Sequence, residues 1–486
     1  MTDGKIAKIK EMSREEVDDF AIRTAMENEL LRKAIYGAKS ERHVPPPPPE
    51  QMRLELGEVA AAEEPPQTEL VSYERKKPAR RKPHPGRHAL PEHLPRKVVR
   101  IEPDEDTTGM KLIGEEVTEA LDYTPAKFVV IRYVRPKYAR PEGEGVVCAP
   151  MPSRPLDKAI AEASLLALIL CDKYLDHLPL YRQIQRFKRL GITIADSTIN
   201  GWIGKVCQLL EPLYQAHRKM VLTRDYLQVD ETTFKVLDRD KRGKAHLGYQ
   251  WVYHSPVERL VLFEYHPRRS KAPPARSLQN YGGYLQTDGY AAYEQFHNKT
   301  GIVMLGCMAH ARRKFFEAGE DHPHVKHALS VFRKLYAIER KVREYQLSHQ
   351  QRQAIRMKEA KPLWEKFQKW MIQEFVQHVP SHPVRKAIEY TLPRWKQLGG
   401  YILNGKLEID NNLIENQIRP VALGRKNYLF AGSHSAAQRA SMIYSLLSTA
   451  KLHQIEPFEW LKSVIKAIPD HPINRIEGLL PQNWDK

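Results

Sequence analysis

Alternation of apolar and polar residues predicts a group of β-strands in the middle of the chain. The runs YLQVDETTFKVLD (from Tyr226), HLGYQWVYHS and RLVLFEYHP are rich in β-branched and aromatic residues, and charged or proline-containing turns separate them. Two later runs, GGYLQTDGYAAYEQF and GIVMLGCMAHARRKFFEAGE, each read as a strand that leads into a helix. This pattern predicts an α/β fold, with a meander of three strands, a fourth parallel strand and helices on the faces.

Helical periodicity and proline content divide the rest of the chain. The stretch that begins VPPPPPE favours extended polyproline backbone over a packed core. In chain order, the predicted segments are an amphipathic helix that could form a short zipper (1–43), a proline-rich basic linker (44–103), a small β module (104–150), a helical region (151–222), the first part of the α/β core (223–322), a helical insertion (323–400), the last part of the core (401–450) and a helical tail (451–486).

The region 151–222 contains the outline of a helix-turn-helix. In QRFKRLGITIADSTINGWI, Gly191 interrupts one helix and a second, polar-faced helix follows. Arg186, Lys188 and Arg189 lie just before the turn and favour contact with DNA phosphates. Helical pairs with no role in DNA binding share this outline, so the pattern leaves both interpretations open.

Composition narrows the classes of partner. The net charge of +18 points first to nucleic acid and second to an anionic membrane surface, with a basic protein that has neither partner as the remaining alternative. The N-terminus lacks the apolar core of a secretory signal, and the run ASLLALILC is shorter than the ~20 residues that span a membrane. The four cysteines form no CxxC pair, which favours a reduced, cytoplasmic chain.

Two aspartates at the ends of similar apolar runs suggest metal chemistry. In YLQVDET, alternation puts Asp230 on the face opposite Val229, and in YLQTDGY, Asp288 stands where the strand gives way to Gly289. Carboxylates on strands ~4.8 Å apart would repel each other without a cation between them. Mg²⁺ prefers oxygen ligands, and two such ions assist in-line phosphoryl displacement. Aspartates near strand ends are also often loop caps or ion-pair partners, so the pair alone is a weak signal.

A third carboxylate would strengthen the metal assignment, and LEIDNNLIENQIRP offers three candidates. Asp410 is placed to cap a short helix that Pro420 is expected to end. Glu415 lies inside that helix and could instead pair with Arg419, four residues later. Spacing alone does not choose between these two acids and Glu408.

Several passages give the chain a strong resemblance to a known family. They are KYLDHLPLYRQ, LQVDET, LQTDGYAAY, CMAHARRKFFE, EIDNNLIENQIRPVALGRKNYLFAGS, IYSLLSTAK and DHPINRIEGLLPQNW. In this order, over more than two thirds of the chain, they resemble transposases of the insertion sequence 66 family, which are bacterial DDE enzymes with an RNase H-like core. The resemblance implies cutting of DNA at the ends of a mobile element and joining of those ends to a target.

The resemblance also implies roles for particular residues. The family's catalytic, metal-binding carboxylates fall on Asp230, Asp288 and Glu415, with Mg²⁺ as the cofactor and Mn²⁺ as its substitute. Cys307 and His310 match a Cys-x-x-His element and are expected to be structural residues near the site, or simply buried core. Local pattern and charge, rather than the resemblance, give the expected DNA contacts, with solvent-facing charge as the alternative. The residues are Arg186, Lys188, Arg189, Arg312, Arg313, Lys314, Arg419, Arg425 and Lys426.

The resemblance further implies partners and leaves two rival functions. The expected partners are the terminal repeats of the element, target DNA, further copies of the chain on DNA, and small accessory proteins of the same element, with no membrane partner. The expected location is the bacterial cytoplasm, at the nucleoid. The rivals are a non-catalytic DNA-binding regulator derived from a transposase and a nuclease on the same core. Three intact carboxylates argue against the regulator, and strand joining would separate a transposase from a nuclease.

One departure concerns the zinc-binding module that family members commonly carry. Arg140 and Gly143 stand where cysteines of CxxC pairs are expected, and only Cys148 is nearby. A structural zinc site needs four Cys or His ligands. We therefore expect residues 104–150 to fold without zinc, and we expect no zinc in the chain.

Overall fold

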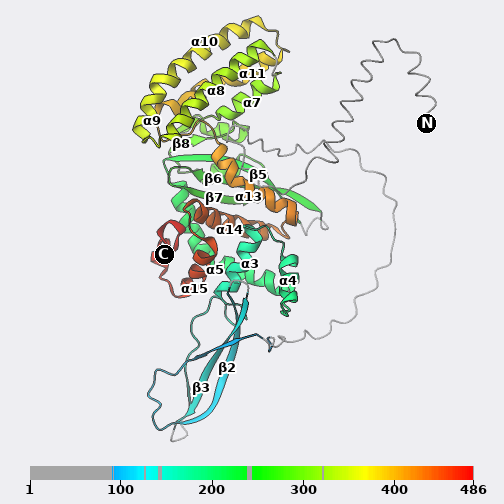
Figure 1. Cartoon of the computed structure of the whole chain (residues 1–486), viewed down its shortest axis with the longest axis vertical. Coiled ribbons are helices and arrows are strands. Elements are labelled where there is room, and N and C mark those ends of the chain that lie inside the picture. The colour runs from blue at the N-terminus through cyan, green and yellow to red at the C-terminus, as the bar shows by residue number, and fades with distance from the viewer. Residues whose placement is uncertain are drawn as a thin grey trace, which may run out of the picture. The chain divides into compact units, whose positions relative to one another are not determined.

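The structure is a computed structural model that describes residues 90, 92, 94–124, 127–140, 145–237, 244–319 and 322–484 (Figure 1). All of these residues belong to one compact unit, Arg80–Lys486. The predicted zipper at 1–43 and most of the predicted linker at 44–103 lie outside the described residues. Within the described residues, no helix has the length and apolar character that crossing a membrane requires.

The first part of the unit is a small β-sheet built around one long strand. β3 (Lys127–Ala139) pairs in parallel with β1 (Arg96–Arg100) and antiparallel with β2 (Lys111–Thr124) and β4 (Val146–Cys148). Alternating burial along β3 puts residues such as Val130 into a core, while charged neighbours on the opposite face remain accessible.

The structure differs from the expected linker at its boundary, because residues 96–100 of the predicted 44–103 linker form β1. Val98 and Val99 favour extended backbone. Pairing with β3 supplies these residues with backbone hydrogen bonds, and the N–H of Ile101 continues the pairing with a bond of 3.1 Å to the carbonyl of Val134. The basic residues of this stretch favoured the linker prediction, although Val98 and Val99 form part of a strand.

Three helices follow the β-sheet: α3 (Ala163–Tyr174), α4 (Leu180–Arg189) and α5 (Asp196–Leu222). The turn between α4 and α5 contains Gly191 with φ of 79°, a left-handed conformation that costs glycine little. Ile199 and Trp202 on α5 are buried, so the predicted polar face of this helix is confined to its other side.

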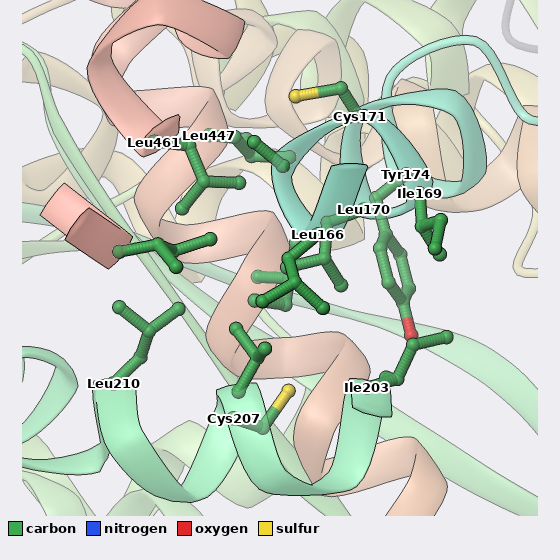
Figure 2. Packing of buried hydrophobic residues seen from close by; sticks show 14 of the residues in the cluster. Leu166, Ile169, Leu170, Cys171, Tyr174, Ile203, Cys207, Leu210, Leu447 and Leu461 are labelled. Carbon is green, nitrogen blue, oxygen red and sulfur yellow. The ribbon is translucent and has the colours of Figure 1, made fainter. Parts of the chain in front are cut away.

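The apolar helix α3 lies inside a helical core that includes C-terminal parts of the chain. It packs against α5, α14 (His434–Leu452) and α15 (Pro457–Ala467). Figure 2 shows Leu166 and Leu170 of α3 beside Leu447 and Leu461 from the C-terminal helices. Because nearly every side of α3 is buried, its run ASLLALILC is a core helix.

The second sheet has five strands in the order β7-β6-β5-β8-β9. β5 (Tyr226–Leu237), β6 (Ala245–Ser255) and β7 (Leu260–His266) form an antiparallel meander. β8 (Gly283–Gln286) and β9 (Ile302–Leu305) continue the sheet in parallel with β5. The predicted α/β fold is therefore confirmed at the level of a mixed sheet covered by helices (Figure 1).

Helices cover the five-stranded sheet. Most of the chain between β9 and α13 is also helical. One face of the sheet packs against α14 and α13 (Asn412–Tyr428). In the described part of the chain, the other helical elements are α6 (Ala272–Ser277), η2 (Ala291–Phe296), α7 (Met308–Glu317), α8 (Pro323–Glu344), α9 (His349–Ile355), η3 (Arg356–Ala360), α10 (Lys361–Gln377), α11 (Pro383–Thr391), η4 (Leu392–Arg394), α12 (Trp395–Gly399), η5 (Gly400–Leu403), η6 (Ile468–Asp470), η7 (Ile473–Leu479) and η8 (Pro481–Asn483).

The expectation that Pro420 ends a short helix is wrong, because α13 continues through this proline to Tyr428. Proline removes one backbone hydrogen bond from a helix interior. Ile414, Ile418 and Val421 nevertheless bury one continuous face of α13 against β5. Packing on both sides of the proline thus outweighs the local cost.

Candidate active site

The two similar sequences YLQVDET and YLQTDGY lie side by side in the sheet. β5 and β8 are parallel neighbours, and their register puts Gln228 opposite Gln286. Asp230 and Asp288 each follow their glutamine by two residues. β8 ends at Gln286, just before Asp288, whereas β5 continues past Asp230 to Leu237. Both carboxylates therefore lie at the edge of the sheet where β8 ends, with Asp230 inside β5 and Asp288 just beyond β8.

Asp230 lies in a crowded, negatively charged environment. Burial raises the pKa of the Asp230 carboxyl well above its usual range, and the charge of Asp288 raises that pKa further. Glu231 and Glu415 add smaller effects in the same direction. The backbone N–H of Glu231 donates a 2.7 Å hydrogen bond to Asp230, which opposes the rise. A cation among these carboxylates would relieve their repulsion.

Glu415 approaches the two aspartates from the first turn of α13 and is half-buried. Burial raises the pKa of Glu415 above its usual value. The positive charge of Arg313 lowers this pKa, whereas Asp410 and Asp288 raise it. The pKa effects link Glu415 to Asp288 and to Asp230, so the three acids of the predicted triad share one electrostatic environment.

A buried amide explains how α13 is held at this edge of the sheet. Nε2 of Gln228 donates to Oε1 of Gln286 and to the carbonyl of Asp410, each at 2.9 Å. Oε1 of Gln228 accepts from the backbone N–H of Ile414 at 3.2 Å. The strand residue therefore fixes the start of α13, and with it Glu415.

Gln286 extends this amide layer, and its loss is expected to destabilise the core. Its Nε2 donates to the carbonyls of Gly306 and Glu408, both at 3.0 Å. Gln286→Leu should cost about 1–3 kcal/mol for each buried group left without a partner. The urea midpoint of unfolding should fall accordingly.

Gln208→Leu is the matched control for Gln286→Leu, because Gln208 is exposed on α5. It should change stability by no more than about 0.5 kcal/mol. An equal urea midpoint for Gln286→Leu and the control would show that the amide layer does not hold the strands and α13 together.

Glu408, one of the three candidates for the third carboxylate, already has partners. Arg352 donates two hydrogen bonds of 2.9 Å to it, and Arg343 donates one of 3.1 Å. Burial would raise the pKa of Glu408, but the hydrogen bonds and charge of Arg352 bring it below its usual value. Glu408 therefore belongs to an arginine network in the helical segment.

Asp410 is also occupied, although not as the expected N-cap residue. α13 begins at Asn412, and Asn411 holds the N-cap position. Asp410 accepts a 2.7 Å hydrogen bond from the hydroxyl of Tyr336 and a 3.1 Å bond from the backbone N–H of Asn412. It supports the start of the helix from one residue further away. Of the three candidate acids, Glu415 is the one whose charge raises the pKa of Asp230.

Glu231 is a member of the site that the sequence pattern did not reveal. Oε1 of Glu231 accepts from Nε of Arg269 at 2.8 Å, and Oε2 accepts from the hydroxyl of Tyr293 at 2.7 Å. The guanidinium of Arg269 lies 3.8 Å from the ring centre of Tyr290. These contacts tie VDET to TDGYAAY, and the two tyrosines after Asp288 are the only sequence signal for them.

Asp288 lies on a tight turn beside a small cavity. The backbone N–H of Tyr290 donates a 2.9 Å hydrogen bond to the Asp288 carboxylate across Gly289, whose φ is 89°. The hydroxyl of Tyr390 donates to the carbonyl of Asp288 at 3.1 Å. Asp288, Tyr390 and Arg394 line a cavity of about 200 Å³. The helical segment thus helps to position the second aspartate.

Cys307 and His310 lie at the start of α7, close to the acids. Cys307 is buried at the N-cap position, and burial raises the pKa of its thiol well above the ordinary range, with Asp410 adding to the rise. Burial lowers the pKa of His310, whereas the charge of Asp288 raises it. Their expected structural role remains a prediction.

The basic residues predicted to contact DNA have different surroundings. Arg186 forms an ion pair with Asp172, and Arg425 donates a 2.6 Å hydrogen bond to the carbonyl of Thr233, so both guanidinium groups already have partners. Arg312 is half-buried. The exposed members of the predicted set are Lys188, Arg189, Arg313, Lys314, Arg419 and Lys426.

Comparison with protein families decides which family this chain represents. The family described as "Transposase IS66 family" matches residues 158–439, more than half of the chain. The chain belongs to the IS66 family of transposases. Further matches are "Transposase C of IS166 homeodomain" (25–99), "zinc-finger binding domain of transposase IS66" (105–139) and "IS66 C-terminal element" (445–482).

This IS66 family chain has relatives in Sinorhizobium fredii that align along nearly its whole length. Uncharacterized protein y4jD is 33% identical over 481 residues, which cover 93% of this chain and 93% of that protein. Uncharacterized protein y4hP is 32% identical over 499 residues, which cover 94% of this chain and 88% of that protein. The resemblance noted in the sequence is therefore confirmed.

The match at 105–139 corrects one expectation about this IS66 family chain. We expected no zinc, and that expectation is contradicted, because the matched domain is a zinc-finger domain and points to zinc binding. The expectation depended on cysteine positions alone. The matched residues contain neither Cys nor His, and the nearest cysteine in the sequence, Cys148, pairs with Lys137 on the neighbouring strand.

Proposed function

We propose that this chain is a transposase that cuts DNA at the ends of an insertion sequence and joins the ends to a target. One observation carries the proposal: Asp230 and Asp288 follow paired positions of adjacent parallel strands, and Glu415 approaches them from α13. A meander of three strands extended by two parallel strands is the topology expected of an RNase H-like core. The family match supports the same class of enzyme.

The three acids fit Mg²⁺ as a cofactor, with Mn²⁺ as a substitute. Asp230, Asp288 and Glu415 offer carboxylate oxygens, the hard ligands that Mg²⁺ prefers. The raised pKa of Asp230, caused by burial and by the charge of Asp288, is what acids show when no counter-charge lies between them. When bound, the ions would supply positive charge at the attacking and leaving oxygens of the phosphate.

Other residues of the chain would support this chemistry. Glu231, held by Arg269 and Tyr293, would fix the backbone beside Asp230. Arg313 is exposed and acts on Glu415, so it would contact a DNA phosphate close to the acids. In each step an oxygen of water or of a 3′-hydroxyl would form the new P–O bond and lose its proton as the leaving P–O bond breaks. This displacement needs no covalent protein intermediate.

DNA binding would rest on exposed basic residues outside the acidic centre. Lys188 and Arg189 end the helix before the Gly191 turn, and Lys426 is exposed near the end of α13. Each phosphate contact on duplex DNA contributes ~0.9 to the dependence of binding on salt. The helix-turn-helix interpretation of α4 and α5, a homo-oligomer on DNA and the small accessory proteins of the element belong to the same proposal.

Cutting and joining of labelled DNA that carries the ends of the element tests the function. The purified full-length chain should release 3′ ends in Mg²⁺ and join them to a second DNA. Cutting without joining would identify a nuclease. Binding without cutting would identify a regulator, and either result would overturn the proposal.

A further inference from the structure

Four histidines and one glutamate meet where three helix ends come together in the helical segment. They form what we call the histidine cluster: His322 and His324 at the start of α8, Glu374 and His378 at the end of α10, and His382 immediately before α11. None of these residues belongs to the acidic centre described above. Their ring centres lie close together, for example 5.2 Å between His324 and His378.

Three members of the histidine cluster direct ligand atoms toward one point. Nδ1 of His324 lies 2.8 Å from Oε2 of Glu374, and Nε2 of His378 lies 3.2 Å from the same oxygen. All three atoms lie within 4.8 Å of one another, and no other His, Cys, Asp or Glu residues in the described part of the chain form such a group of three. Ligands about 2.0–2.1 Å from a tetrahedral zinc lie about 3.3 Å apart, so small side-chain adjustments would accommodate an ion.

The buried polar atoms of the histidine cluster provide an independent observation. Within the described residues, no group forms a hydrogen bond of acceptable direction with Oε2 of Glu374, Nε2 of His378 or Nδ1 of His322. Glu374 is only 7% exposed. The contacts to Glu374 therefore have hydrogen-bond distance without hydrogen-bond geometry. Buried polar atoms rarely lack partners, and a cation at the point of convergence would supply one to Oε2 of Glu374 and to Nε2 of His378.

We propose that His324, Glu374 and His378 bind a divalent transition metal, with Zn²⁺ as the best-suited ion. Imidazole nitrogens suit zinc and its neighbours in the first transition row, whereas Mg²⁺ prefers a shell of oxygens. Two histidines and one carboxylate leave one position of a tetrahedral ion open. A water molecule could fill it; the ring of His322 lies beside the site, 5.1 Å from the ring centre of His324, but His322 is not one of the three converging ligands.

His382 has a positioning role in this site. Its Nδ1 accepts a 3.3 Å hydrogen bond from the backbone N–H of Val384, so that nitrogen is occupied by the start of α11. Its ring stacks on the ring of His378 with a centre distance of 4.2 Å. This stacking fixes the plane of the His378 imidazole, as outer partners of metal ligands commonly do.

A metal in the histidine cluster would tie the start of α8 to the end of α10. Because His382 stacks on His378, the start of α11 would be held as well, and α11 packs against α7. α7 carries His310, whose pKa is raised by the charge of Asp288, and Arg313, whose charge lowers the pKa of Glu415. The inferred role of the metal is to stabilise this helical support, and it does not depend on the proposed transposition chemistry.

Zinc titration of the full-length chain tests the proposal. The chain is stripped with a chelator and titrated with Zn²⁺ against a chromophoric competitor in excess Mg²⁺. The His324→Ala, His378→Ala double variant should bind one equivalent fewer than wild type. Glu374→Gln, which preserves side-chain size, should weaken that equivalent about tenfold or more. Zinc held by the domain matched at 105–139 would persist in every variant.

His327→Ala is the matched control, because His327 is exposed on α8 and its ring packs on Trp370 outside the cluster. It should bind zinc as wild type does. The same number of equivalents and the same affinity in wild type and in Glu374→Gln would overturn the proposal. Co²⁺ provides a second measurement: its ligand-field absorption in the wild-type chain should be reduced in Glu374→Gln, and an unchanged spectrum would also overturn it.

Discussion

Glu415→Gln is expected to reduce cutting of terminal DNA by about 10²–10³-fold or more, the range seen when an enzyme loses one well-placed electrostatic group. Glutamine preserves the size of the side chain and the helix, but it is a weaker ligand for Mg²⁺ than a carboxylate. Glu415 lies in the first turn of α13, where the amide of Gln228 fixes the helix start. The substitution therefore removes charge from the acidic centre without moving it.

DNA affinity should be unaffected by Glu415→Gln, because Lys and Arg contacts with phosphates carry the binding. Gel shifts across a salt series should give the wild-type affinity and slope. Asp410→Asn is the matched control, because the hydroxyl of Tyr336 and the backbone of Asn412 can still pair with asparagine. A variant pattern in which Asp410→Asn is inactive and Glu415→Gln cuts normally would assign the third carboxylate to Asp410.

Asp230→Asn is expected to abolish cutting and, in the absence of divalent ions, to raise thermal stability at alkaline pH. Burial and the charge of Asp288 raise the pKa of Asp230 in the folded protein. When the pKa of an acid rises on folding, the folded protein favours the protonated acid. The resulting contribution to stability is complete below the unfolded pKa of about 3.9, and it is lost as pH rises through the folded pKa. Asparagine cannot ionise, so the variant avoids this loss.

Thermal unfolding with and without Mg²⁺ measures both parts of the Asp230→Asn prediction. Without metal, the Tm of the variant relative to wild type should increase between pH 5 and pH 8. With Mg²⁺, wild type should gain stability and the variant should gain less, since a ligand that binds the folded state stabilises it. Asp225→Asn, at an exposed position of the preceding turn, should behave as wild type. A variant that is less stable than wild type at pH 8 without metal would show that Asp230 has a counter-charge after all.

The sheet edge that carries the aspartates was predictable because its two strands repeat one pattern. YLQVD and YLQTD are written alike, and the parallel register of β5 and β8 matches them residue for residue. The amide layer was less accessible to sequence reasoning. The alternating pattern of a strand predicts that a glutamine faces solvent. Gln228 and Gln286 are instead fully buried, and they form hydrogen bonds with segments distant in the chain.

Features that depend on long-range packing were not predictable from local pattern. Pro420 is a helix terminator in isolation, and the buried face of α13 against β5 overrides it. The ligands of the histidine cluster come from two stretches, around His324 and around His378, whose proximity depends on how α8 packs against α10. The expectation of no zinc in the β module was wrong for another reason. It depended on missing cysteines, whereas the family comparison identifies a zinc-finger domain there. The roles of Asp230, Asp288 and Glu415 remain predictions.

One measurement tests most directly whether metal bound by Asp230, Asp288 and Glu415 acts on the scissile phosphate. It is the cutting of terminal DNA in which one sulfur replaces a non-bridging oxygen of that phosphate. Mg²⁺ strongly prefers oxygen, whereas the softer Mn²⁺ accepts sulfur more readily. Cutting of the sulfur-substituted strand by the wild-type chain should be slow in Mg²⁺ and restored in Mn²⁺, while unmodified DNA is cut in both ions. Equal cutting of both DNAs in Mg²⁺, or cutting that persists in a chelator, would contradict a metal-assisted reaction at these acids.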